Sequence, residues 1–157
     1  MARIYVETSV WSHAFAEDAP ESRASTLEFL GQTHEAAHEL FISDVVLAEI
    51  GRAQEALAAD LLRLIDEHSP VLLELDEDAA DLADRFLRLG AVPPSKVEDA
   101  QHVAISIVNE LDMLLSWNYR HLVNVRRREA FHHIGALSGY YKPLHIITPP
   151  EVSDESE

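Results

Sequence analysis

The segment VEDAQHVAISIVNELDMLLSWN, residues 97–118, decides the fold class. Its apolar residues recur at the spacing i, i+3, i+4, i+7, i+8 and i+11, which predicts an amphipathic helix with one buried face. These residues are Ala100, Val103, Ala104, Ile107, Val108 and Leu111. Asp112 then precedes a short apolar run at residues 113–116, which we interpret as a strand. A helix that leads directly into an apolar strand is typical of an α/β protein.

The same alternation of strands and helices extends over most of the chain. We expect further strands at residues 3–6, 40–42, 71–75 and 145–147, and further helices at 20–35, 44–57, 61–69, 76–90 and 126–137. This order predicts an α/β/α sandwich with a parallel sheet of about four to five strands and helices on both faces. Residues 1–150 are expected to form a single domain, and the acidic residues 151–157 a disordered tail.

Composition and charge narrow the possible environments and partners. The chain has no cysteine, no secretory signal and no apolar stretch that could span a bilayer, so we expect a cytoplasmic protein without a membrane partner. The formal net charge of −16 would repel a phosphate backbone at long range. A nucleic-acid enzyme of this charge needs metal ions in an acidic pocket or a local basic patch. Surface acid could also serve solubility alone.

Four polar residues fall where α/β proteins place their ligand sites, beyond the carboxyl ends of the strands. Glu7 follows the first strand, Glu49 lies on the helix after the second, Asp99 begins its helix, and Asn118 follows the strand at 113–116. Crowded carboxylates repel each other, a divalent cation relieves the repulsion, and oxygen ligands suit Mg²⁺ or Mn²⁺. Such an ion can activate water and stabilise charge on a phosphodiester. We therefore predict these four as the catalytic residues, with Glu7, Glu49 and Asp99 as metal ligands.

Three motifs resemble those of PIN domains. Residues 7–11, ETSVW, resemble the strand-one motif, which is usually an Asp followed by Thr or Ser. Residues 99–104, DAQHVA, resemble the acidic helix start Asp-Ala-x-His-x-Ala, and residues 114–122, LLSWNYRHL, resemble a last site motif in which Trp-Asn precedes a His. Glu49 falls where the helical Glu of the family is expected. The resemblance covers nearly the whole chain, and its motifs come in the right order.

The resemblance implies a Mg²⁺- or Mn²⁺-dependent ribonuclease site. Many bacterial and archaeal members of the family resemble the toxins of VapBC-type toxin–antitoxin pairs, which cleave RNA, form dimers and are held inactive by an antitoxin. It therefore implies an RNA substrate, an antitoxin protein as partner and a homodimer. Two residues depart from the family pattern: Glu7 replaces an Asp, and Asn118 is neutral at a position that is often acidic. A site with fewer charged ligands binds a divalent ion more weakly.

Thr8, Ser9, His102, Ser116 and His121 are expected to support the site or to contact substrate. His102 lies one helical turn after Asp99 and could orient that carboxylate, or it could be a satisfied buried histidine. His121 could contact substrate or make a structural hydrogen bond. Ser116 and Asn118 could bind a metal-bound water or phosphate, although Asn118 also suits a turn.

Other conspicuous residues have two interpretations each. The run Arg126–Arg128 could steer RNA toward the site, or it could be a solvated helix flank. Trp11 and Trp117 could stack on a base, but a place in the core or an interface is favoured for both. Asp112 precedes its strand and therefore suits a turn or cap at the opposite end of the sheet.

Two other functions stay open on the sequence alone. A PIN-fold module that no longer cleaves, and only binds protein or RNA, fits the substitutions at Glu7 and Asn118. A doubly wound hydrolase of small phosphate esters is less well supported, because the chain lacks a Gly-rich phosphate loop and Glu7-Thr8-Ser9 offers no Asp nucleophile.

Overall fold

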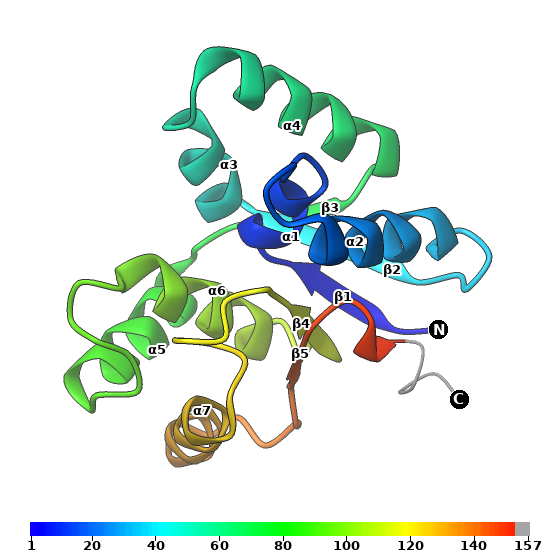
Figure 1. Ribbon diagram of the computed structural model, residues 1–157. Helices are drawn as coiled ribbons and strands as arrows, with labels where there is room; N and C mark the ends of the chain where they lie inside the picture. Colours follow the sequence, from blue (N-terminus) through cyan, green and yellow to red (C-terminus); the bar gives the residue numbers. More distant parts are fainter. Residues whose placement is uncertain (153–157) are drawn as a thin grey trace.

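The centre of the molecule is a parallel sheet built from short apolar strands. In the first strand Ile4, Tyr5 and Val6 are all completely buried, as expected for a strand with helices on both faces. The computed structural model describes residues 1–152 and shows a sheet with the strand order β3-β2-β1-β4-β5 (Figure 1). The strands are β1 Arg3–Val6, β2 Glu39–Ser43, β3 Val71–Leu73, β4 Met113–Leu115 and β5 His145–Ile147. The predicted α/β class with a parallel sheet is confirmed.

Two groups of helices cover the sheet. In Figure 1 the helices between β1 and β3 lie above the sheet, and those that follow β3 lie below it. Within these groups α1 packs against α2, α3 and α4, and α5 packs against α6 and α7. The helices are α1 Thr8–His13, α2 Pro20–Gln32, α3 Asp44–Gly51, α4 Glu55–His68, α5 Glu77–Arg88, α6 Val97–Val108 and α7 Val125–Leu137.

The direction in which the chain adds strands reverses between β1 and β4. The chain first builds outward from β1 to β2 and β3, then returns to place β4 on the other side of β1 and continues to β5. Such a reversal leaves a crevice at the carboxyl ends of the two central strands. Val6 pairs with Leu115 in the parallel register, so Glu7 and Ser116 emerge side by side at this crevice.

Helix ends form where the sequence predicts them. The side chain of Ser43 accepts a hydrogen bond from the N–H of Val45 at the start of α3, and that of Asp76 accepts one from the N–H of Ala79 at the start of α5. Gly90 and Gly139 follow α5 and α7 with φ of 77° and 94°, a conformation that costs glycine little. These four residues are of the types that local preferences favour at helix ends, and the structure uses each of them there.

Several expectations differ from the structure. The helix expected at 20–35 ends at Gln32, the helix expected at 61–69 is the second half of a longer helix, and the strand expected at 71–75 ends at Leu73. The helix α1 was not predicted, because six residues without acidic or strongly periodic pattern give a weak signal. The expected helix at 44–57 ends at Gly51, a poor helix former, and α4 begins at Glu55. Val152 is buried in the core although the tail was expected from residue 151, and residues 153–157 of that tail lie outside the described residues.

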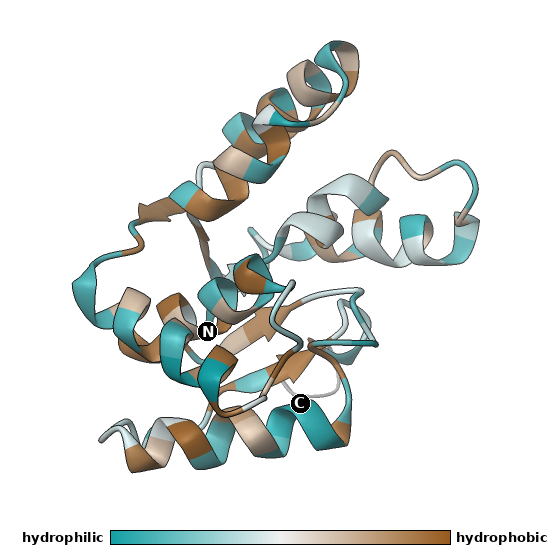
Figure 2. Cartoon of the chain, turned by 90° about the vertical axis from the view of Figure 1, so that its left-hand side faces the viewer, coloured by the Kyte–Doolittle hydropathy of each residue, from teal (hydrophilic) through white to brown (hydrophobic). Residues whose placement is uncertain are grey.

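The apolar side chains meet at the two faces of the sheet. Figure 2 shows mostly hydrophobic strands in the middle of the molecule and helices on which hydrophilic and hydrophobic residues alternate. Below the sheet, Phe86 of α5 and Phe131 of α7 are fully buried with an edge-to-face contact, their ring centroids 5.1 Å apart. Within residues 1–152 we find no helix long and apolar enough to cross a membrane.

The Phe86 side chain provides a test of this packing. Phe86→Ala removes a fully buried ring between α5 and α7, and we expect the free energy of unfolding to fall by about 3–5 kcal/mol. The matched control is Leu89→Ala at the exposed end of the same helix, with an expected change within about 0.5 kcal/mol. Urea denaturation followed by circular dichroism measures both, and equal losses in the two variants would contradict this packing.

Candidate functional site

Glu7 lies at the carboxyl end of β1 and is the N-cap of α1. Glu7 is 5% exposed, and its carboxylate accepts hydrogen bonds from three donors. Ser9 donates through its backbone N–H at 2.9 Å and through its hydroxyl at 2.7 Å, and Ser116 donates its hydroxyl from the end of β4 at 2.5 Å. The two predicted supporting serines therefore hold Glu7 in place.

Glu49 reaches the same crevice from the middle of α3. Its Oε1 accepts a hydrogen bond from the hydroxyl of Thr8 at 2.7 Å and one from Nε2 of His102 at 2.5 Å. Burial alone would raise the pKa of Glu49, but its hydrogen bond with His102 and the charges of His102 and Arg52 lower the pKa overall. Glu49 is therefore ionised and firmly oriented.

His102 is fully buried on α6 between Glu49 and Tyr5. Its Nδ1 lies 2.7 Å from the Tyr5 hydroxyl, which also lies 2.8 Å from the hydroxyl of Ser43. Burial lowers the pKa of His102, yet the hydrogen bond to Glu49 and the charges of Glu7, Glu49 and Asp99 raise it above its ordinary value. His102 thus orients Glu49, whereas the sequence suggested Asp99 as its partner.

Sequence reasoning did not identify Tyr5 and Ser43 as members of this network. Tyr5 lies in an apolar strand, and burial strongly raises the pKa of its hydroxyl. A buried tyrosine hydroxyl needs a hydrogen-bond partner, which is the signal that could have led to it. The Ser43 hydroxyl both caps α3 and contacts the Tyr5 hydroxyl.

Asp99 lies in the first turn of α6, beside Asn118 and His121. Its Oδ2 is 3.4 Å from Nδ2 of Asn118 and 3.5 Å from Nδ1 of His121. Burial raises the pKa of Asp99 to about 6, and the negative charges of Glu7 and Glu49 contribute to the rise. Asn118 also accepts a hydrogen bond from the N–H of His121 through its Oδ1, so it is a turn residue and a neighbour of Asp99 at once.

These residues fit a divalent cation by their chemistry. One ligand atom each from Glu7, Glu49 and His102 lies within 4.8 Å of the others. The predicted ligand Asp99 is not in this group. Its pKa is raised first by burial and then by the negative charges of Glu7 and Glu49, so its carboxylate interacts with both glutamates electrostatically. Carboxylate oxygens suit Mg²⁺ or Mn²⁺. His102 could become a ligand only if its Nε2 gave up the hydrogen bond to Glu49, so in this arrangement it positions Glu49 instead.

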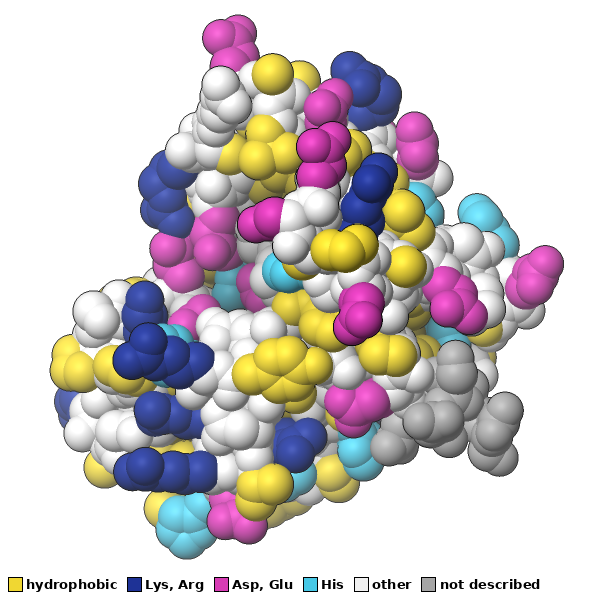
Figure 3. All heavy atoms as spheres, in the orientation of Figure 1, with side chains coloured by type: hydrophobic (Ala, Val, Ile, Leu, Met, Phe, Trp, Pro, Cys, Tyr) yellow, Lys and Arg dark blue, Asp and Glu magenta, His cyan; other side chains and the backbone are white. Residues whose placement is uncertain are grey.

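A positive rim lies next to the acidic crevice. In Figure 3 a hollow with acidic and histidine side chains opens between α3 and α6, and Lys and Arg side chains lie below it. The pKa of His121 is lowered by burial and then by the charges of Lys96, Arg127 and Arg120, so these three cations lie near enough to act on it. The side of the site that carries Asp99 and His121 is therefore bordered by positive charge.

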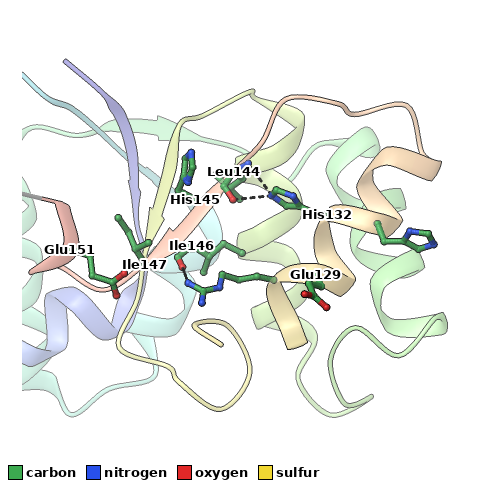
Figure 4. Close-up of a pocket in the computed structure, with 9 residues that line it drawn as sticks. Glu129, His132, Leu144, His145, Ile146, Ile147 and Glu151 are labelled. Carbon is green, nitrogen blue, oxygen red and sulfur yellow. Dashed lines mark hydrogen bonds between the residues drawn. The ribbon is translucent and has the colours of Figure 1, made fainter. Parts of the chain in front are cut away.

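A second hollow, of about 590 Å³, runs along the outer edge of β5 and contains none of the predicted site residues. His132 of α7 lies 3.2 Å from the carbonyl oxygen of Leu144 and Arg128 donates to that of Ile146, so side chains of α7 satisfy the open edge of the sheet (Figure 4). Arg127 similarly donates to the carbonyl of Ala91. Two residues of the basic run at 126–128 therefore have structural contacts.

The tryptophans and Asp112 also have defined places. Trp11 is completely buried and belongs to the core, as favoured from the sequence. Trp117 is partly buried at the edge of the crevice. Asp112 accepts a hydrogen bond from the N–H of Arg3 and pairs with Lys142 at the amino end of the sheet, which confirms its structural role.

Comparisons with known proteins do not assign the chain to a family. No protein-family model matches the chain, and a search of curated proteins gives no match. The resemblance to PIN domains therefore stays a prediction that rests on the three motifs. The structure shows the α/β sheet, the closeness of Glu7 to Glu49, and the contact of Asp99 with Asn118.

The raised pKa of Asp99 leads to a pH-dependent stability. The folded chain keeps this proton up to a pH of about 6, whereas an ordinary Asp loses it near 3.8, so stability falls as the pH rises through this window. We expect Asp99→Asn to stabilise the metal-free protein at pH 7 by about 1–3 kcal/mol, and by much less at pH 4.

Urea denaturation in EDTA at the two pH values measures this difference. Glu98→Gln, which alters the adjacent carboxylate and its exposed contact with Arg52, is the control and should change stability by less than about 1 kcal/mol. Destabilisation of Asp99→Asn by the same amount at both pH values would show that Asp99 is not under electrostatic strain.

Proposed function

We propose that the protein is a Mg²⁺- or Mn²⁺-dependent endoribonuclease of the PIN type that hydrolyses RNA phosphodiester bonds. The observation that carries the proposal is the grouping of Glu7 and Glu49 with His102 at the crevice between β1 and β4, where burial, together with the charges of both glutamates, also raises the pKa of Asp99. Partly buried carboxylates that are close to one another repel each other. A bound divalent cation would remove this repulsion, and the relief would favour binding of the cation. No Lys or Arg shares a salt bridge with Glu7, Glu49 or Asp99 within residues 1–152.

The side chains around the carboxylates would keep the site rigid. Ser9 and Ser116 fix Glu7, and Thr8 and His102 fix Glu49. A bound divalent cation would supply an activated water and neutralise charge on the phosphodiester. Because the donors of the chain already hold the glutamates, little reorganisation is needed when substrate arrives. Asn118 places a neutral amide beside Asp99, where it can orient a water molecule or a phosphoryl oxygen.

The positive rim supports a polyanionic substrate. Lys96, Arg120 and Arg127 lie near His121 and Asp99, although the chain as a whole carries a net charge of −16. Exposed charges farther apart than about 8 Å are largely screened at physiological ionic strength, so nearby cations act on an approaching phosphate more strongly than distant acids do. The rim therefore offers a local path for a phosphate backbone to the carboxylates.

The proposal extends to a cytoplasmic toxin of a toxin–antitoxin pair that forms a homodimer and is inhibited by an antitoxin. This part rests on the resemblance to VapBC-type toxins. Exposed apolar side chains at Leu62 of α4 and at Val71 and Leu72 of the edge strand β3 support a protein partner, since such residues on a free surface are costly when they form a patch.

Metal binding and cleavage test the proposed nuclease with Glu49→Gln, which keeps the size of the side chain and removes its charge. We expect calorimetry to show Mn²⁺ binding to the wild type and at least tenfold weaker binding to the variant, and RNA cleavage to fall by about 100-fold or more. Glu98→Gln is the matched control on the adjacent helix and should bind and cleave like the wild type. A wild type that binds neither Mn²⁺ nor Mg²⁺ would refute the proposal.

One observation favours a non-catalytic binding module as a second candidate. The carboxylates of Glu7 and Glu49 already accept three and two hydrogen bonds from the chain. A site that satisfies its own acids can be kept for structure alone. The same assays separate the two functions, because a binding module would retain RNA without Mn²⁺-dependent cleavage that depends on Glu49.

Expression in bacteria tests the toxin part of the proposal. We expect induction of the wild type to stop growth and degrade cellular RNA, and induction of Asp99→Asn to permit growth, because the substitution removes one of the three carboxylates. Growth curves and RNA gels from matched cultures, with equal protein levels confirmed by immunoblot, give the answer. Equal growth and intact RNA in both cultures would contradict a toxin.

A further inference from the structure

A hollow with aromatic walls lies beside the carboxylates and has no role in the site described so far. Its volume is about 620 Å³, within the range of small-molecule sites. It is bordered by the end of α1, the first turns of α2, the loop after β4 and the segment after β5. The lining residues are His13, Ala19, Pro20, Glu21, Ser22, Ser25, Trp117, Tyr119 and Pro150.

Three rings follow one another along this hollow. The ring centroids of His13 and Trp117 are 5.7 Å apart with an interplanar angle of 34°, and those of Trp117 and Tyr119 are 6.4 Å apart at 60°. Tyr119 is 59% exposed and has an accessible ring. The bases of single-stranded nucleic acids commonly stack on accessible aromatic rings of this kind.

Hydrogen bonds hold two of the rings in place. The indole Nε1 of Trp117 donates to the hydroxyl of Thr26 at 2.8 Å, and its backbone N–H donates to the hydroxyl of Ser9 at 2.9 Å. Nδ1 of His13 lies 2.6 Å from the carbonyl oxygen of Ser9. A flat ring that entered the hollow would therefore meet a preformed surface and lose little free energy in ordering it.

The same residues tie the hollow to the carboxylates. Ser9, which contacts both His13 and Trp117, donates two hydrogen bonds to Glu7. Trp117 stands in the chain between Ser116, which binds Glu7, and Asn118, which contacts Asp99. Trp117 therefore connects the hollow to the residues that hold Glu7 and Asp99.

The charge of the hollow favours a base over a phosphate. Its lining contains no Lys or Arg within residues 1–152 and includes Glu21, which would repel an anion. Ser22, Ser25 and Glu21 offer hydroxyl and carboxylate groups to the N–H groups at the edge of a nucleobase. The cations Lys96, Arg120 and Arg127 instead surround His121.

We propose that this hollow binds one unpaired nucleobase of the RNA, next to the phosphodiester that is cleaved. The inference rests on the proposed nuclease and names its substrate class as single-stranded RNA, since a base within a duplex is not free to enter a pocket. The phosphate chain would continue from the carboxylates toward the positive rim, and the base would stack on Trp117 and Tyr119.

Fluorescence anisotropy with a labelled single-stranded RNA of about eight nucleotides tests the inference. Ca²⁺ replaces Mn²⁺ during binding, and a gel confirms that the RNA stays intact. We expect Tyr119→Ala to weaken binding by about fivefold to 100-fold, and Tyr119→Phe, which keeps the ring, to bind more tightly than Tyr119→Ala. Tyr141→Ala removes a tyrosine that is 80% exposed outside the hollow and is the matched control with unchanged binding.

A second series identifies the bound base directly. RNAs with a single abasic position, moved along the strand, should show one position at which loss of the base weakens binding to the wild type but not further to Tyr119→Ala. RNA that is bound and cleaved equally well by Tyr119→Ala, or with every abasic position, would overturn the base site and leave the nuclease intact. A wild type that neither binds nor cleaves RNA would overturn both.

Discussion

The buried carboxylate of Glu7 joins three segments that are far apart in the chain. Glu7 ends β1, caps α1 through the N–H of Ser9, and accepts the hydroxyl of Ser116 from the end of β4. A charge in such a place is costly unless hydrogen bonds compensate it, and here the donors are hydroxyls and a backbone N–H. These neutral donors give both carboxylate oxygens hydrogen-bond partners, but they do not neutralise the negative charge of Glu7. That charge acts on its neighbours: it contributes to the raised pKa of Tyr5, Asp99 and His102.

A second buried network is a series of hydrogen bonds that runs from Ser43 through Tyr5 and His102 to Glu49. It connects the ends of β1 and β2 with α3 and α6, and every buried side-chain nitrogen or oxygen within residues 1–152 has a hydrogen-bond partner. Networks of this kind in a low-dielectric interior are rigid, and the loss of one member leaves the others unsatisfied. The position of Glu49 therefore depends on residues that never touch a substrate, and Tyr5 and Ser43 are as necessary to the geometry as the carboxylates themselves.

The sequence predicted the order of strands and helices well because that order follows from local periodicity. The helix through Ala100 and Val103 and the caps at Ser43 and Asp76 are local patterns, and all are present. The strand-end rule also brought Glu7, Glu49, Asp99 and Asn118 to one place. The partner of His102 could not be obtained in this way. Sequence spacing suggested Asp99 at i−3, but the rotation of α6 against α3 decides the contact and selects Glu49, which is 53 positions away.

The same limit applies to the hollow beside the site. Its rings come from α1 and from the loop after β4, and only the parallel pairing of β1 with β4 brings them together. The carboxylates thus have two kinds of neighbour, the cations that act on His121 and the aromatic rings around Trp117. In a chain with a net charge of −16, attraction at long range cannot select an RNA. Under the proposed nuclease function, selection must therefore act at short range. A strand would gain from both the cations and the rings only if its backbone and one free base reached them at the same time.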